Sequence, residues 1–337
     1  MSSPSLPLKI AIATYGHTAA VKDGRAPIEG VAPDFVEINP IIAAFRRMVR
    51  NVEFDVCEMA PATYMIARAA GAPFKALPLF VFRRFHHAGL VYRPDAGIRQ
   101  PKDLEGKKAG VRAYSVSTGI WTRGILQNDC GVDLSKVTWV VDDEEHVTTL
   151  RLPPNVVHAP QGQSLIGMMA DGSLQAAFTG PAGIGRAGAP SAGWDASKQA
   201  QGWDASKLAQ GPNYPELFPD APTAEKAWYR RTGIYPVHGL IVVKDELLSA
   251  HPWLARSLFD AFVQSKALWL QQLERDGAAS DTDRHYLAMS EVVGDPLPLG
   301  IAPNRPAIEA LIRYSYQQAL LPQHYEIDEM FVDPQAA

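Results

Sequence analysis

Cysteine is scarce in this chain, which has only Cys57 and Cys130 among its 337 residues. Two cysteines far apart in the sequence cannot build a disulfide framework or a cysteine-rich metal cluster. Both lie in or beside apolar segments, so we expect buried, unreactive thiols.

The chain also lacks an excess of positive charge and any long apolar run. Its net charge of −4 excludes the basic surface that nucleic acids or acidic membranes require. No apolar run reaches the roughly 18 residues of a membrane-spanning helix. The first residues show no basic region before a short apolar stretch, and Pro4 and Pro7 interrupt it, so they do not resemble a signal peptide. We therefore expect a cytoplasmic location.

Strand and helix patterns alternate along the first third of the chain. Apolar runs at 9–14, 54–58 and 74–82 predict strands, and 61–70 predicts a helix with a proline near its first position and a glycine just past its end. Such alternation is typical of an α/β fold in which helices cover a mainly parallel sheet on both faces.

A polar connector at 93–108 separates this series from a second one. The late helices, 252–274 and 306–319 with Asn304 as a cap, have no sheet of their own, so we expect them to return to the first lobe. The expected lobes and insert are as follows: lobe 1 is 1–92 plus 237–337, lobe 2 is 93–236, and a Gly/Ala/Pro/Ser-rich insert near 179–222 holds the pentapeptide WDASK twice. Two crossings between lobes predict a hinged clamshell with a cleft for a small carboxylated molecule.

The strongest local signal is the segment 111–126, where a strand runs through a hydroxyl-rich turn into a helix. A helix N-terminus with hydroxyl groups beside it favours an anion. The alternative is simple capping of the helix by a serine, which needs no ligand. The candidates for a carboxylate clamp are Arg112, Tyr114, Ser115, Ser117 and Thr118, with Arg123 as either a contributor or a surface charge.

Further candidates lie at the ends of other strands, where ligands bind in open α/β sheets. In the run 83–87, alternation places Arg84 with His86 on one face and Arg83 with His87 on the other, and we expect Arg84 or His87 to face the cleft. The other candidates are His146 in an acidic loop after a strand, His17, His238 and Glu58. No HExxH or Cys/His spacing supports a metal site, so a divalent ion is the less favoured alternative.

Five segments together resemble the 4,5-dihydroxyphthalate decarboxylases, which are cytoplasmic relatives of the type II periplasmic binding proteins. The segments are 9–24, 34–40, 54–71, 103–140 and 229–248. The resemblance covers nearly the whole chain except the WDASK insert. It implies a two-lobed type II periplasmic-binding-protein-like clamshell, and loss of CO2 from an aromatic diacid to give 3,4-dihydroxybenzoate in phthalate catabolism, without an organic cofactor.

That reaction sets chemical requirements that the candidate residues can meet. Direct loss of CO2 would leave an aryl anion, whereas protonation of the carboxylate-bearing carbon lets a para hydroxyl supply the electrons. We expect His146 and His87 to act as acid and base, with His238, His17 and Tyr114 lining the cleft. We expect the first turn of the 117–128 helix to hold the carboxylate that stays, together with Arg112, while Arg84 orients the ring.

Two other functions stay open from the sequence. One is a non-catalytic solute-binding protein for a small aromatic carboxylate, and the other is decarboxylation of a different substrate, such as another hydroxylated benzoate. The thiamin-pyrimidine synthase branch of the fold uses a cysteine-rich iron motif, which two distant cysteines cannot supply. We expect a small aromatic carboxylate as ligand and a homo-oligomer as the working form.

Overall fold

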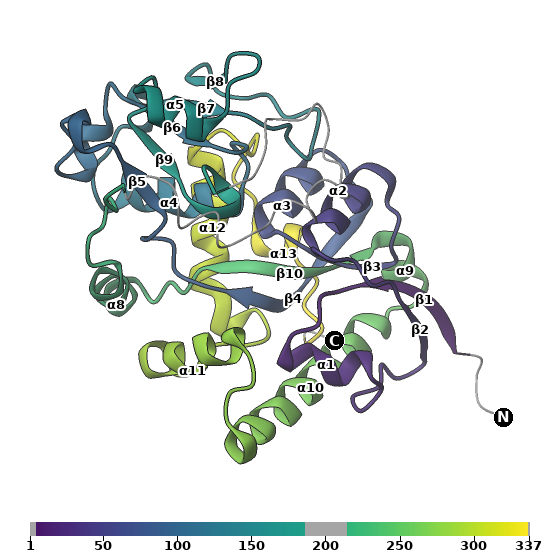
Figure 1. Ribbon diagram of the computed structural model, residues 1–337. Helices are drawn as coiled ribbons and strands as arrows, with labels where there is room; N and C mark the ends of the chain where they lie inside the picture. The colour runs from purple at the N-terminus through teal and green to yellow at the C-terminus, as the bar shows by residue number, and fades with distance from the viewer. Residues whose placement is uncertain (1–4, 186–213, 336–337) are drawn as a thin grey trace. The chain divides into compact units, whose positions relative to one another are not determined.

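The computed structural model describes residues 5–185 and 214–335 (Figure 1). Most of the expected insert, including both WDASK copies, lies outside the described residues. The chain forms two compact units, each with its own sheet. Unit 1 comprises 1–84, 232–310 and 325–337, and unit 2 comprises 85–231 and 311–324.

The sheet of unit 1 has five strands in the order β2-β1-β3-β10-β4. Their bounds are β1 (Leu6–Ala11), β2 (Val31–Phe35), β3 (Val56–Met59), β4 (Phe74–Arg83) and β10 (Val237–Lys244). β1 pairs in parallel with β2 and β3, while β10 runs antiparallel to both of its neighbours, β3 and β4. The start of β10 therefore lies at the same edge of the sheet as the ends of β3 and β4.

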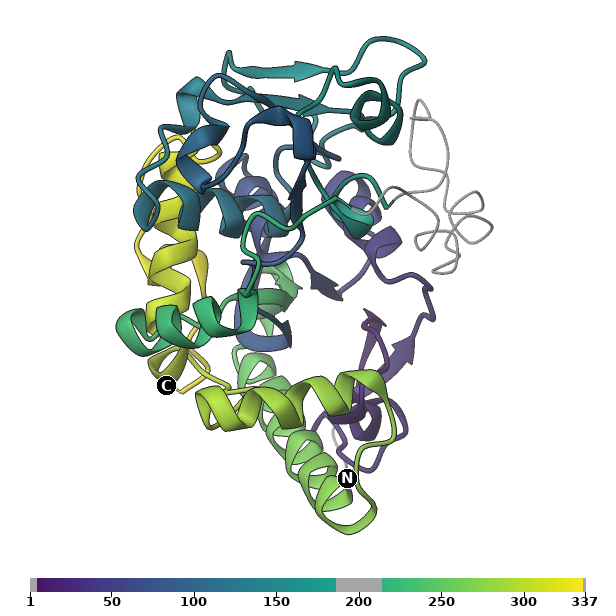
Figure 2. The same cartoon turned by 60° about the vertical axis from the view of Figure 1, so that its left-hand side comes forward.

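Helices cover both faces of this sheet. They are α1 (Gly16–Lys22), α2 (Ile42–Asn51), α3 (Pro61–Ala69), α9 (Asp245–Ala250), α10 (Leu254–Asp276), α11 (Asp281–Val293) and α13 (Ile327–Met330), with a 3-10 turn η5 (Ala302–Asn304). α1 and α10 pack together, α2 packs against β3, and α3 packs against β10. Figure 2 shows α11 following α10 after a turn.

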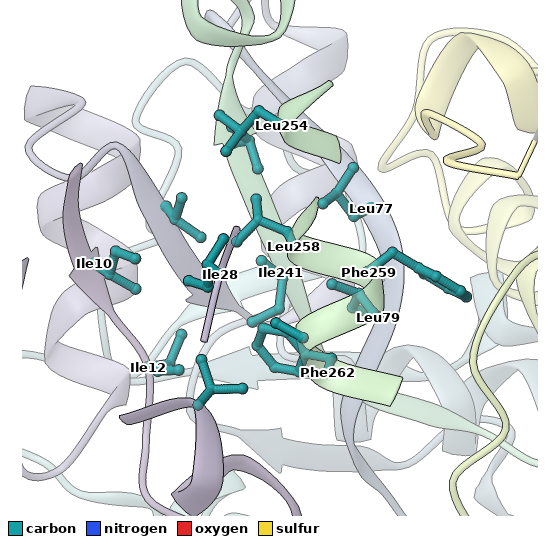
Figure 3. Packing of buried hydrophobic residues seen from close by; sticks show 14 of the residues in the cluster. Ile10, Ile12, Ile28, Leu77, Leu79, Ile241, Leu254, Leu258, Phe259 and Phe262 are labelled. Carbon is teal, nitrogen blue, oxygen red and sulfur yellow. The ribbon is translucent and has the colours of Figure 1, made fainter. Parts of the chain in front are cut away.

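The core of unit 1 forms where α10 meets the sheet. Leu254, Leu258 and Phe262 recur every four residues and so share one face of α10. They pack with Leu79 and Ile241 in one buried cluster (Figure 3). Because successive residues of a strand point to opposite faces, the continuous burial of β10 from Gly239 to Val243 requires a covering layer on each side.

Unit 2 contains the second sheet, in the order β5-β9-β6-β7-β8, with β5 antiparallel to β9 and the other pairs parallel. Its strands are β5 (Leu90–Tyr92), β6 (Lys108–Val111), β7 (Thr138–Val141), β8 (Val156–His158) and β9 (Ala176–Phe178). Its helices are α4 (Ser117–Asn128), α5 (Leu165–Asp171) and α8 (Ala221–Thr232), with 3-10 turns η1 (Pro94–Ala96), η2 (Pro101–Leu104), η3 (Leu134–Lys136) and η4 (Gly180–Ala182). Both units thus combine a mainly parallel sheet with helices.

The division into units differs from the expected lobes near the C-terminus. α12 (Arg305–Gln317) begins in unit 1, but from residue 311 the chain belongs to unit 2. Tyr314 packs edge-on against Trp121 of α4, and Gly124 leaves the space that its ring fills. Gln318 donates to the carbonyl of Ile120, which ties this segment further to α4.

Two other sequence expectations differ from the structure. Asn304 does not cap α12, because its side chain binds Arg83 and the carbonyls of Pro298 and Gly300. Cys57 is buried as expected, whereas Cys130 is only partly buried. Within the described ranges, no helix combines the length and the apolar content needed to cross a membrane.

Candidate active site

Polar and aromatic side chains gather at one edge of the sheet of unit 1. The pairing of β10 sets Val237 beside Arg83, Gly239 beside Phe82 and Ile241 beside Glu58. The loop that follows β1 reaches the same edge. In open α/β sheets, ligands bind just beyond the carboxyl ends of the strands, where the loops that follow the strands begin.

Glu58 of β3 is a buried carboxyl group within this edge. Its side chain is held by the Tyr15 hydroxyl, which donates to Oε1 (2.9 Å), and by the Ala13 amide, which donates to Oε2 (3.0 Å). The residue is only 2% exposed, and burial raises its pKa to about 7. Glu58 therefore changes its protonation state near neutral pH.

Tyr15 is the residue of this edge that sequence reasoning missed. Its ring stacks with His17 (centroids 5.3 Å apart) and with Phe82 (6.2 Å), and it remains partly exposed. Burial and the neighbouring Glu58 carboxylate raise its pKa, so the hydroxyl keeps its proton. The available signal was a tyrosine directly after a strand, in the same loop as the histidine that drew attention.

Two further polar residues lie near Phe82: His238, at the start of β10, and Arg84. The His238 ring meets Phe82 edge-on (5.6 Å), and Arg84 follows directly after β4. Burial, with the positive charge of Arg84 as a second cause, lowers the pKa of His238 well below its ordinary value. Burial also lowers the pKa of Arg84. A neutral imidazole and a cation thus occupy neighbouring positions.

Arg83 and His17 have structural roles instead. Arg83 is 1% exposed and binds Asn304 and the carbonyl of Tyr235. His17 is buried, and its Nε2 bonds to the Val81 carbonyl (2.9 Å). Aromatic rings pack around His17 and burial lowers its pKa to about 4, while its expected place on a cleft wall stays a prediction.

In unit 2, the turn before α4 already binds a carboxylate of the protein itself. Glu145 accepts from the Tyr114 amide (2.7 Å), from the Ser115 amide (3.2 Å) and from the Ser115 hydroxyl. The expected anion preference of this turn is therefore present, but an acidic side chain from the loop after β7 uses it. Ser115 and Tyr114 are thus engaged within the protein.

Arg112 and Arg123 both make contacts within unit 2, and their expected roles in a carboxylate clamp stay predictions. Arg112 forms a buried ion pair with Asp143 (3.1 Å) and donates to the Pro181 carbonyl. Arg123 is 0% exposed, lies over the Tyr114 ring and donates to Gln318 (2.7 Å). Arg123 is therefore not the surface charge that the sequence allowed, and it also donates to the Tyr114 carbonyl of the turn.

The other candidates of unit 2 lie at the carboxyl edge of its sheet or in the loop before β5. Ser117 and Thr118 open α4, and His146 lies in the loop after β7; all three are buried. His87 is packed edge-on against Phe218 and Trp228, and burial lowers its pKa to about 4. His87 is thus a neutral ring in an aromatic environment.

The donor set does not point to a metal. In 5–185 and 214–335, no three His, Cys, Asp or Glu side chains come together in a way that could hold an ion. The groups of the unit 1 edge instead form an acid–base set: a carboxyl group that titrates near pH 7, a phenol, a neutral imidazole and a guanidinium.

Comparison with known proteins supplies the family. A family model described as NMT1/THI5 like matches residues 38–151. A 4,5-dihydroxyphthalate decarboxylase of Comamonas testosteroni is 30% identical over 339 aligned positions, which cover 97% of this chain and 96% of that protein. The chain belongs to the 4,5-dihydroxyphthalate decarboxylase family. A second member, from Pseudomonas putida, is 36% identical over 179 positions, covering 51% of this chain and 69% of that protein.

Solved structures confirm the fold expected for this family. The periplasmic aliphatic sulphonate-binding protein of Escherichia coli aligns with 99% of this chain and 94% of its own, at a TM-score of 0.53 and 12% identity. The predicted type II periplasmic-binding-protein-like fold of this decarboxylase family member is therefore confirmed.

Proposed function

We propose that this protein catalyses the non-oxidative decarboxylation of 4,5-dihydroxyphthalate to 3,4-dihydroxybenzoate and CO2. The observation that carries the proposal is the relation to the Comamonas testosteroni decarboxylase along 97% of the chain. The acid–base set at the edge of the unit 1 sheet supports it, because the chemistry needs those groups.

The reaction replaces a carboxylate by a proton on an aromatic ring. When the hydroxyl para to that carboxylate ionises, its electrons flow into the ring and make the carboxylate-bearing carbon basic. That carbon takes a proton, the bond to the carboxylate breaks, and the electron pair returns to the ring as CO2 leaves. The site must therefore remove a hydroxyl proton, deliver a proton to carbon and hold the anionic substrate.

The edge of unit 1 offers a group for each task. Arg84 supplies a positive charge for a carboxylate or the ionised hydroxyl. His238 is neutral and is the group placed to accept the hydroxyl proton, and the negative charge of the bound diacid would favour the imidazolium form that burial and Arg84 alone disfavour. Glu58 holds a proton up to about pH 7 and so serves as the acid of the set. His146, His87, Ser117 and Thr118 of unit 2 remain predicted participants.

The purified protein should be incubated with 4,5-dihydroxyphthalate while CO2 and 3,4-dihydroxybenzoate are measured. We expect equal amounts of both, and unchanged turnover after treatment with a chelator. Phthalate, which lacks the para hydroxyl, serves as the matched control and should not react. Binding of 4,5-dihydroxyphthalate without turnover would instead favour a solute-binding protein. The cytoplasmic location and the homo-oligomer stay predictions, to be tested by cell fractionation and sedimentation.

A further inference from the structure

We propose that Tyr15 and Glu58 form a two-residue proton relay that delivers the proton to the carbon losing its carboxylate. This inference rests on the proposed decarboxylation and names the path by which its acid acts.

Glu58 needs an intermediary to pass a proton to a substrate. Both of its oxygens accept hydrogen bonds from within the protein, and only 2% of the residue is exposed. A carboxyl group in this position cannot itself approach a substrate carbon. Tyr15 is bonded to Oε1 at 2.9 Å and is partly exposed, so the phenol is the group through which Glu58 can act.

Tyr15 is held in place at its backbone and at its ring. Its amide donates to the Thr18 hydroxyl (2.8 Å), and its ring stacks with Phe82 and with the buried ring of His17. His17 is fixed in turn by the Val81 carbonyl. A phenol fixed on the backbone and at the ring keeps its hydroxyl aligned with Glu58, as proton transfer requires.

The strand next to Glu58 leaves room beside its carboxyl group. Residue 239 is a glycine, and a Cβ placed there would lie 3.3 Å from Oε1 and 3.2 Å from the Phe82 Cβ. A larger residue would crowd the oxygen that bonds to Tyr15. Gly239 follows His238 in β10, so the residue next to the imidazole in the sequence is the one that leaves room for the Glu58 carboxyl group.

The charges around Glu58 come from three elements and from Tyr15. Lys22 of α1 favours the ionised carboxylate, while Cys57 of β3 and Tyr286 of α11 are themselves affected by the Glu58 charge. The Lys22 amine is occupied by the Thr14 hydroxyl and Glu37. Burial outweighs this single cation, so the carboxyl group keeps its proton to about pH 7.

The relay balances as follows. When Glu58 is protonated on Oε1, its hydrogen bond with Tyr15 reverses: Glu58 donates to the Tyr15 oxygen, and the Tyr15 hydroxyl proton turns toward the substrate. Glu58 then gives its proton to the Tyr15 oxygen while Tyr15 gives its own hydroxyl proton to the ring carbon. Tyr15 ends neutral, Glu58 ends as a carboxylate, and the substrate carbon gains one C–H bond. The bond between this carbon and the carboxylate then breaks, its electron pair returns to the ring, and CO2 leaves. One proton from water restores Glu58.

The test compares the pH dependence of kcat in the wild type with Tyr15→Phe and Glu58→Gln. Because Glu58 must be protonated, wild-type kcat should fall as pH rises through about 7. Tyr15→Phe should lower kcat by about 10²–10⁴ with KM little changed. In Glu58→Gln the residual kcat should no longer fall near pH 7. Tyr64→Phe is the control, because that hydroxyl donates to the Met330 carbonyl and not to Glu58, so its loss should leave kcat unchanged.

Two outcomes would overturn the relay while leaving the decarboxylase proposal intact. They are wild-type kcat in Tyr15→Phe, and an unchanged alkaline fall of kcat in Glu58→Gln. Absence of turnover in the wild type would overturn both proposals. If Tyr15→Phe does not fold, as judged by circular dichroism, the Glu58→Gln profile decides, since glutamine can accept from the Ala13 amide and donate to the Tyr15 oxygen.

Discussion

Replacing Glu58 with glutamine removes a buried carboxyl group whose ionisation opposes folding. In the unfolded chain this group ionises around its ordinary pKa of 4.5, while burial raises the folded value to about 7. Between these values the folded state holds more protons than the unfolded state, so the free energy of unfolding falls as pH rises. The difference of about 2.5 between the folded and unfolded pKa values corresponds to a loss of about 3 kcal/mol in the free energy of unfolding. This loss is complete above pH 7.

Urea unfolding of the wild type and Glu58→Gln between pH 5 and pH 8 measures this effect. The free energy of unfolding of the wild type should fall by roughly 2–3 kcal/mol relative to the variant across that range. Glu53→Gln is the matched control. Arg47 lowers the pKa of Glu53 to about 2, so that change should leave the pH dependence in this range unaltered. Parallel curves for the wild type and Glu58→Gln would show that Glu58 is not a buried titrating group.

Three further changes test other parts of the structure. Gly124→Ala places a Cβ 2.0 Å from the buried Tyr314 ring, so the free energy of unfolding should fall by about 1–3 kcal/mol, although alanine favours a helix more than glycine does. Equal or higher stability would contradict the packing of α12 on α4. Arg112→Met leaves Asp143 buried without its cation and should cost about 3–5 kcal/mol in urea unfolding, most of it regained with Asp143→Leu. His238→Asn should lower kcat by about 10²–10⁴ with KM little changed, and wild-type kcat would exclude it as the base.

Local signals predicted much of the fold. The hydroxyl-rich turn and the apolar residues after it predicted the helix 117–128, and α4 has these bounds. The proline near the start of 61–70 and the glycine after it likewise located α3 to within a residue. The short edge strands β2 and β8 were missed, because their partly exposed residues and a proline in β2 give little apolar pattern.

The site could be predicted only in part, because its decisive contacts join residues far apart in the sequence. The strand-end pattern indicated Glu58 and His238, whose roles stay predictions, but nothing local indicates that Tyr15 donates to Glu58 across 43 positions. In the same way, the hydroxyl-rich turn indicates an anion without indicating that Glu145 is that anion. Tertiary packing decides which partner a charged loop residue binds, and a local sequence pattern carries no information about that packing.

The central claim is that this chain removes CO2 from a hydroxylated aromatic diacid. The most direct test follows 4,5-dihydroxyphthalate, labelled with ¹³C in its carboxyl carbons, by NMR in D2O with the purified protein. We expect one labelled carboxyl signal per molecule to be lost to CO2 and bicarbonate, while 3,4-dihydroxybenzoate gains a single deuterium at the vacated carbon. Labelled substrate that stays intact in the presence of folded protein would contradict it.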